Sequence, residues 1–317
     1  MAAVITSPLE FNVADLYVDL REMAGRHLML KCEGFNFAGS IKLKAAVEMV
    51  DAMERDGRVT PGTTLVESSS GNMGVALSLV AASKGYRFVC VTDVRCTHAA
   101  RRAMEAFGSE VHVISEPDSS GAYLGSRIAY VRALCRDNPG FVWLNQYANP
   151  CNWMGHYRST APEIAKEFPD LDVLFVGAGT TGTLMGCARY FRETQPSVRI
   201  VAVDSVGSVT FGTKAATRLI PGLGTSVRPQ ILDESLVDDV VHVEERDTVR
   251  TCHELVRRGY LFGGSTGTVV SGALRWLSTR DENLVCVAIA PDFGGNYLDS
   301  LYQGKWLADA GLTADSD

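Results

Sequence analysis

Lys42 is the side chain whose surroundings most favour covalent chemistry. An apolar run at 28–30 predicts a strand before it and a helical pattern at 45–53 follows, so Lys42 should lie in the first turn of a helix. Gly39 permits a tight turn, and the Ser40 hydroxyl is suited to cap the helix N-terminus. The helix dipole opposes a positive charge there, which lowers the lysine pKa and leaves a usable amine nucleophile. The alternative is an ordinary solvated lysine beside an N-cap.

Three glycine-rich turns add weight to that lysine. They occupy 68–74, 177–183 and 263–268, and a helical pattern follows each of them. The first two also directly follow an apolar, strand-like run. Backbone N–H groups at a helix N-terminus bind phosphate readily. One candidate lysine together with several such turns predicts a phosphorylated carbonyl cofactor, for which pyridoxal 5'-phosphate is the obvious choice.

Strand-like and helix-like segments alternate along most of the chain and must position these residues. Predicted strands lie at 27–32, 64–67, 87–92, 111–114, 141–144, 172–176, 200–203, 237–243 and 284–289. Predicted helices lie at 41–55, 72–84, 97–107, 123–136, 152–168, 183–193, 247–258 and 268–277. Repeated βα units predict mostly parallel sheets covered by helices, and two α/β lobes with a cleft between them fit best. Residues 205–235 are irregular and should form a long functional loop.

Composition excludes several classes of function. The net charge of −7 over 317 residues argues against nonspecific nucleic-acid binding, which needs a basic face. The eight cysteines form no Cys-x-x-Cys pair and the six histidines show no metal-type spacing, so we expect no metal site. We expect the thiols to be reduced, as in a cytoplasmic protein. The first ten residues do not resemble a signal peptide, and no apolar run approaches the length of a membrane span.

The glycines also support a different class of enzyme. Gly177, Gly179 and Gly182 match the dinucleotide-binding fingerprint, and Asp204 ends the next predicted strand at roughly the spacing of a ribose-binding acid. A nicotinamide-dependent oxidoreductase is therefore a second hypothesis. It leaves Lys42 and the two other glycine turns unexplained.

Together, the lysine and the three turns resemble the fold-type II pyridoxal-phosphate enzymes, in particular their cysteine synthase branch, over nearly the whole chain. The resemblance implies a two-lobed α/β fold similar to that of tryptophan synthase β. Residues 44–145 would form a smaller mobile lobe, and residues 1–43 and 146–317 the larger, cofactor-binding lobe. It also implies a homodimer that acts on small amino acids.

The resemblance assigns roles to the candidate site residues. Lys42 would form the Schiff base with the cofactor, Asn72 would bond the ring hydroxyl, and Ser265 would face the pyridine nitrogen. The phosphate would be held by the turn residues Gly177, Gly179, Thr180, Thr181, Gly182 and Thr183. The substrate carboxylate would be held by Ser68, Ser69, Ser70 and Gly71. A neutral serine at the ring nitrogen makes the ring a weaker electron sink, which favours β-elimination and replacement.

Shorter motifs at 116–118, 145–149, 202–204, 207–209 and 221–224, with Trp153, resemble one branch of this family. That branch joins O-phospho-L-serine to L-glutamate and supplies 2,3-diaminopropionate for siderophores and peptide antibiotics. We therefore expect a transferase that performs β-replacement. Two alternatives stay open: a cysteine synthase using sulfide with O-acetylserine or O-phosphoserine, and a catalytically silent homologue that binds a partner protein.

Substrates with phosphate and several carboxylates need cationic or hydroxyl partners. Arg127 and Tyr147 are the candidates, with Arg158 as a third, because a guanidinium binds carboxylate or phosphate through two parallel hydrogen bonds. The alternatives are a solvated helix charge for Arg127 and core packing for Tyr147. Two departures from the family pattern bear on the site: Lys44 is a possible competing amine, and 292–298 matches the late family motif only in part.

Overall fold

The computed structural model describes residues 4–119, 121–280 and 283–313. Its strands are β1 (Tyr17–Asp19), β2 (Leu28–Cys32), β3 (Thr64–Ser68), β4 (Arg87–Asp93), β5 (Glu110–Ile114), β6 (Phe141–Trp143), β7 (Val173–Gly177), β8 (Arg199–Ser205), β9 (Asp239–Val243) and β10 (Cys286–Ala290). Its α-helices are α1 (Arg21–Ala24), α2 (Lys42–Arg55), α3 (Asn72–Lys84), α4 (His98–Ala106), α5 (Leu124–Asp137), α6 (Cys151–Arg158), α7 (Thr160–Glu167), α8 (Gly182–Thr194), α9 (Glu245–Arg257), α10 (Gly264–Leu277) and α11 (Gly304–Asp309). Short 3-10 helices are η1 (Pro8–Glu10), η2 (Glu234–Leu236) and η3 (Gly294–Tyr297).

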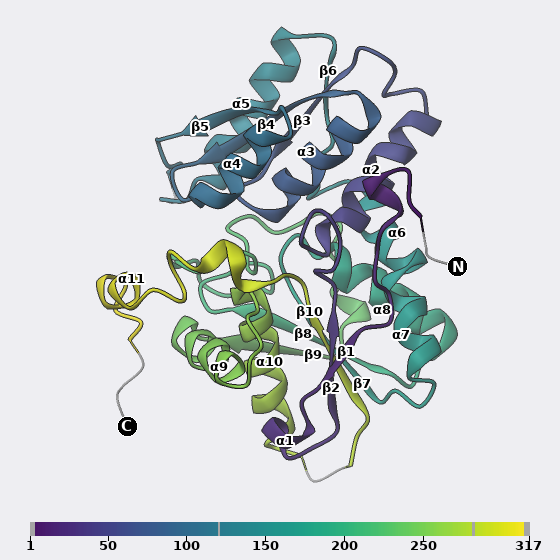
Figure 1. Ribbon diagram of the computed structural model, residues 1–317, viewed down its shortest axis with the longest axis vertical. Helices are drawn as coiled ribbons and strands as arrows, with labels where there is room; N and C mark the ends of the chain where they lie inside the picture. The colour runs from purple at the N-terminus through teal and green to yellow at the C-terminus, as the bar shows by residue number, and fades with distance from the viewer. Residues whose placement is uncertain (1–3, 120, 281–282, 314–317) are drawn as a thin grey trace.

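The strands form two separate sheets, which Figure 1 shows one above the other with their own helices. The six-stranded sheet has the order β1-β2-β10-β7-β8-β9, and the four-stranded sheet has the order β5-β4-β3-β6. Neighbouring strands run parallel except β1, which pairs antiparallel with β2. The α/β class with mostly parallel, helix-covered sheets is therefore confirmed.

The six-stranded sheet is buried on both faces because its strands are apolar at successive positions. Phe175 of β7 packs with Trp276 of α10 on one face, where α9 also contributes to the core. Its neighbour Leu174 points to the opposite face and packs in a core with Phe191 of α8. Consecutive strand residues alternate between faces, so a strand covered on both sides needs an unbroken apolar run.

The four-stranded sheet follows the same rule. Leu65 of β3 belongs to the core formed with α2, α3 and α4, and the adjacent Val66 packs on the other face against Val131 of α5. Strands of this sheet lie within 64–143, whereas the larger sheet combines β1 and β2 with β7 to β10. The division into lobes at residues 44 and 145 stays a prediction, and its first boundary falls inside α2.

The helix predicted at 152–168 is present as two helices, α6 and α7, which are separated at Ser159. Ser159 has φ −129° and ψ −74°, outside the helical region, and its hydroxyl donates to the Gly155 carbonyl at 2.7 Å. Pro162 follows in the first turn of α7, where it cannot donate an N–H to the preceding helix. The short edge strand β1 was not predicted.

The predicted turn at 263–268 also differs, because α10 begins at Gly264 and residues 264–268 already belong to the helix. Gly267 serves packing there: a Cβ would lie 2.2 Å from the Cys252 sulfur of α9. The long loop predicted at 205–235 is confirmed as irregular between the last residue of β8, Ser205, and the start of η2 at Glu234.

Candidate active site

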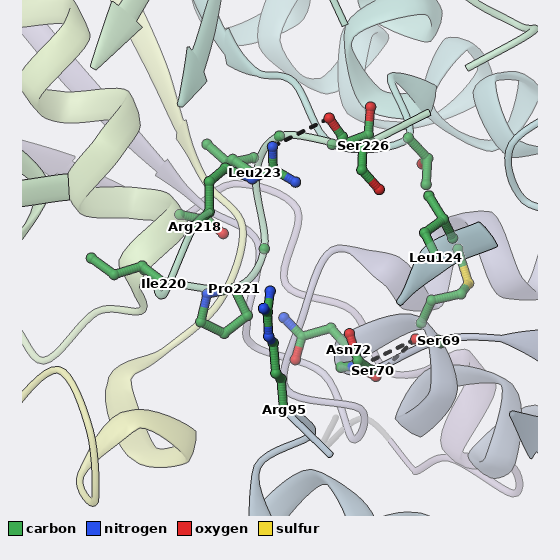
Figure 2. A pocket seen from close by; sticks show the side chains of 18 of the residues that line it. Ser69, Ser70, Asn72, Arg95, Leu124, Arg218, Ile220, Pro221, Leu223 and Ser226 are labelled. Carbon is green, nitrogen blue, oxygen red and sulfur yellow. Dashed lines mark hydrogen bonds between the residues drawn. The ribbon is translucent and has the colours of Figure 1, made fainter. Parts of the chain in front are cut away.

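A cavity of about 450 Å³ is lined by residues from both sheets and their loops. The cavity lies at the carboxyl ends of β3, β4, β7 and β10, where open α/β sheets usually bind their ligands. The predicted site residues that line it are Lys42, Ser69, Ser70, Gly71, Asn72, Arg127, Tyr147, Gly177, Gly179, Thr180, Thr183 and Ser265. Figure 2 shows part of this wall, with Ser69, Ser70 and Asn72 facing the loop around Pro221.

Lys42 is the first residue of α2. Burial lowers the pKa of its amine, and the charge of Asp292 works against that shift. The expected direction is confirmed, but burial is the main cause. The expected capping role of Ser40 is wrong, because the N-cap residue is Ile41 and the buried Ser40 hydroxyl has no hydrogen-bond partner among the described residues. Asn36 orders this loop instead, donating to the Ser40 carbonyl at 2.9 Å.

The turn after β3 is shaped by its own side chains. The Ser69 hydroxyl accepts from the N–H groups of Gly71 at 3.3 Å and Gly74 at 2.9 Å. Ser70 lines the cavity beside them. Ser68 does not reach the cavity: it ends β3, fully buried, and its carbonyl accepts from Gln146 Nε2 at 2.9 Å. Ser68 therefore supports the turn from behind rather than facing a substrate.

Within the described chain, the turn between β7 and α8 leaves several backbone N–H groups free at the start of a helix. In the part of the chain that the structure describes, the N–H groups of Gly179, Thr180 and Thr181 have no hydrogen-bond partner. Thr181 has φ +66° and sits at the N-cap of α8, which directs these N–H groups away from the helix ladder. Free N–H groups at a helix N-terminus fit a phosphate.

Two residues of α6 brace this turn from behind. Asn152 Nδ2 donates to the Thr180 hydroxyl at 3.0 Å, and His156 Nε2 lies 3.2 Å from the Thr183 hydroxyl. Burial lowers the pKa of His156 well below its usual value, so the ring is neutral. Thr181 and Gly182 belong to the turn but do not line the cavity. Gly182 faces α6 instead, where a Cβ would lie 2.1 Å from the Asn152 amide oxygen.

Ser265 lies in the first turn of α10 with its hydroxyl directed at the opposite wall. A Cβ on Gly222 would lie 2.1 Å from the Ser265 oxygen, and Gly222 has φ +115°. Only glycine fits both conditions. The 205–235 loop thus approaches Ser265 closely at Gly222, and both residues line the cavity.

Asp292 is a functional candidate that the sequence motifs did not single out. It is buried, and its Oδ2 accepts from Asn72 Nδ2 at 2.7 Å and from the Tyr297 hydroxyl at 2.6 Å. Burial raises the pKa of Asp292, while these donors and Lys42 oppose the rise. Asp292 holds the Asn72 amide in one orientation. The partial match at 292–298 was the available signal.

Arg127 and Tyr147 both line the cavity, but Arg158 does not. Arg127 is 6% exposed, so the alternative of a solvated helix charge is wrong. Its Nε lies 3.2 Å from Asp93 Oδ2, yet Nε and Nη1 make no hydrogen bond within the described chain. Arg158 instead pairs with Glu48 on the surface, with more than half of its side chain exposed.

Lys44 is not a second amine at the site. Its Nζ lies 2.9 Å from the Glu33 carboxylate and 2.8 Å from Glu163 Oε2, with its side chain 9% exposed. Lys31, fully buried, adds a second cation 3.0 Å from Glu163. We call Lys31, Glu33, Lys44 and Glu163 the buried charge cluster. Burial opposes the charged form of Lys44, but the two carboxylates outweigh it and raise its pKa.

The cavity wall is strongly cationic although the chain is acidic. Its charged lining residues are Lys42, Arg95, Arg127, Arg218 and one acid, Asp93. Asp204, the candidate ribose-binding acid, is buried and does not line the cavity. In the described residues, no group of His, Cys, Asp and Glu could hold a metal ion. No described helix has the length and apolarity that a bilayer crossing requires.

Residues 16–292 match the model of the pyridoxal-phosphate dependent enzyme family, and the chain belongs to that family. It is a pyridoxal-phosphate-dependent synthase, and this membership sets aside the nicotinamide alternative. It is 41% identical over 280 residues to N-(2-amino-2-carboxyethyl)-L-glutamate synthase from Ralstonia nicotianae, covering 88% of this chain and 83% of the relative.

Solved structures agree on the fold. A crystal structure of O-ureido-L-serine synthase superposes with a TM-score of 0.87 at 33% identity, covering 96% of this chain and all of the other. An O-acetylserine-dependent cystathionine β-synthase from Helicobacter pylori gives a TM-score of 0.87 at 26% identity, covering 95% of this chain and all of the other. The names of these relatives describe synthases with different substrates or products.

Proposed function

We propose that this enzyme joins O-phospho-L-serine to L-glutamate by β-replacement, giving N-(2-amino-2-carboxyethyl)-L-glutamate for 2,3-diaminopropionate supply. The observation that carries the proposal is the cationic cavity around Lys42, where three arginines stand against one acid. A phosphorylated donor and a dicarboxylic acceptor both need such a wall, whereas sulfide does not. The relative from Ralstonia nicotianae supports the same reaction by its name.

The residues present fit the cofactor. Lys42 would carry it covalently, the N–H groups of Gly179 to Thr181 would bind its phosphate, and Asn72 and Ser265 would contact its ring. When bound, pyridoxal phosphate supplies an electron sink that acidifies the α-proton of an amino acid. The free Lys42 amine would take that proton from the donor, and its lowered pKa suits it to act as a base.

The remaining steps depend on side chains around the donor. Ser69, Ser70 and Gly71 would hold its α-carboxylate, and Arg127 with Tyr147 would hold the phosphate. The phosphate departs from Cβ with the electrons of the C–O bond, and the glutamate nitrogen bonds to the same carbon and loses a proton. Lys42 then returns a proton to Cα. Arg127 suits the phosphate because its buried guanidinium keeps donors unused.

Product analysis tests the proposal. The holoenzyme is incubated with O-phospho-L-serine and either L-glutamate or sulfide, and products are identified by mass. We expect the glutamate adduct at a kcat/KM well above that for cysteine formation. O-acetyl-L-serine in place of the phosphorylated donor should react more slowly. Efficient cysteine formation with no glutamate adduct would make the enzyme a cysteine synthase.

We further propose that the enzyme is a cytoplasmic homodimer whose lobe at 44–145 moves against the rest of the chain. All eight cysteines are free, which supports a reducing compartment. Light scattering coupled to gel filtration tests the dimer, and hydrogen exchange with and without substrate tests the motion. Fractionation of the producing cells tests the location.

A further inference from the structure

Two arginines from different sheets lie at the mouth of the cavity. Arg95 follows β4 in the four-stranded sheet, and Arg218 belongs to the 205–235 loop of the other sheet. Among the described residues, neither has a carboxylate within ion-pair distance. Figure 2 shows Arg95 extending into the cavity toward Pro221 and Asn72, with Arg218 on the facing loop.

Both guanidinium groups are oriented by contacts that leave donors free. Arg218 Nη1 donates to the carbonyls of Gly207 at 2.7 Å and Thr225 at 3.2 Å. Arg95 lies with its guanidinium carbon 5.0 Å from the centre of the Tyr123 ring. The nearest lining acid, Asp93, is already engaged with Arg127 and with the Arg95 backbone N–H. Within the described chain, these positions are therefore fixed without an ion pair to a carboxylate.

Two like charges that share a cavity repel each other. Burial lowers the pKa of Arg218; Asp204, Glu245 and Tyr147 oppose that shift, and the charge of Arg95 makes the smallest contribution to it. The repulsion disappears when an anion lies between the two groups. Because the arginines come from opposite sheets, such an anion would also draw the two walls together.

We propose that Arg95 and Arg218 together bind the distal carboxylate of a dicarboxylic amino-acid acceptor. The inference rests on the proposed function and names the residues that select the second substrate. The acceptor's amine must point inward to Lys42, so its side-chain carboxylate faces outward. Arg95 is exposed at that outer edge, whereas Arg127 lies buried deeper beside Asp93.

The test separates the two half-reactions of the holoenzyme. Phosphate release from O-phospho-L-serine is followed in a single turnover without acceptor, and then KM is measured for L-glutamate and for L-glutamine. Glutamine has the same shape but carries no distal charge. The variants are Arg95→Gln, Arg218→Gln and the double variant. Arg102→Gln, which changes an exposed arginine of α4 outside the cavity, is the matched control.

Each single variant should raise KM for glutamate roughly tenfold to hundredfold, the loss expected for one charge-assisted contact. KM for glutamine should change little, so the preference for glutamate collapses. If both arginines hold one carboxylate, the double variant should lose less than the product of the single losses. Arg102→Gln should match the wild type.

Other outcomes overturn the inference. An equal loss with glutamate and glutamine would mean that the arginines only order the loop. A loss confined to phosphate release would assign them to the donor. If the wild-type enzyme forms no glutamate adduct at all, the proposed function itself fails, which the same assay detects before any variant is made.

Discussion

Replacing Lys44 by methionine tests the reasoning about buried charge most directly. The change removes one of two cations from the buried charge cluster and leaves Glu33, fully buried, and Glu163 to share Lys31. Two charge-assisted hydrogen bonds are lost, at 2.9 and 2.8 Å, each worth about 1.5–3 kcal/mol. Leaving a buried carboxylate short of a partner typically costs 3–5 kcal/mol, so we expect a loss of about 4 kcal/mol.

Urea denaturation followed by far-UV circular dichroism measures this loss, and Lys84→Met is the control. Lys84 also contacts two carboxylates, Asp51 at 2.8 Å and Glu54 at 2.7 Å, but its side chain is 23% exposed. Solvent screens that pair, so its removal should cost less than about 1 kcal/mol. Equal, small losses for the two lysine variants would refute the reasoning. Glu33→Gln added to Lys44→Met should restore part of the stability.

Four further changes have definite expected outcomes. Lys42→Ala should abolish turnover while the urea midpoint stays near that of the wild type, and a retained β-replacement rate would contradict the Schiff-base assignment. Arg127→Ala should raise KM for donor or acceptor at least ~tenfold because it removes a buried charged donor, and unchanged values for both would contradict a substrate-binding role. Gly222→Ala should lower stability by about 1–3 kcal/mol and lower activity further because the new Cβ displaces Ser265; Gly212→Ala, with φ +77° and open space around it, measures the backbone strain alone. Burial raises the pKa of Glu67 to about 7. Its contribution to stability is therefore complete below its unfolded pKa and is lost as pH rises through 7, by roughly 3 kcal/mol at most. Urea midpoints of the wild type should fall between about pH 5 and 8, and the same fall in a Glu67→Gln variant would exclude this carboxyl as the cause.

The alternation of strands and helices could be predicted because each element carries its own periodic pattern. The break between α6 and α7 could not, since one helical pattern runs through Ser159 and Pro162 lies where a first turn tolerates it. Strand β1 is three residues long and depends on pairing with β2 and on packing against residues distant in sequence, such as Phe168, so no local signal marks it.

The site residues also divide into those that local sequence predicts and those that only the fold brings together. Lys42 and the glycine turns were predictable because the chemistry of each is contained within a few consecutive residues. Asp292 was not, because its partner Asn72 lies 220 positions away and only the fold joins them. The burial of Arg127 likewise depends on Asp93 of a neighbouring strand. The cationic balance of the cavity was hidden because the chain as a whole is acidic.

The order of strands in the larger sheet has a consequence for synthesis on the ribosome. Strand β2 cannot complete its hydrogen bonding until β10 emerges, since Leu28 pairs with Cys286. The smaller sheet, assembled from neighbouring stretches of chain, can form long before that moment. While residues 144–285 are synthesised, the nascent chain should therefore carry one finished sheet and one exposed strand edge, and aggregation or chaperone capture would begin at that edge.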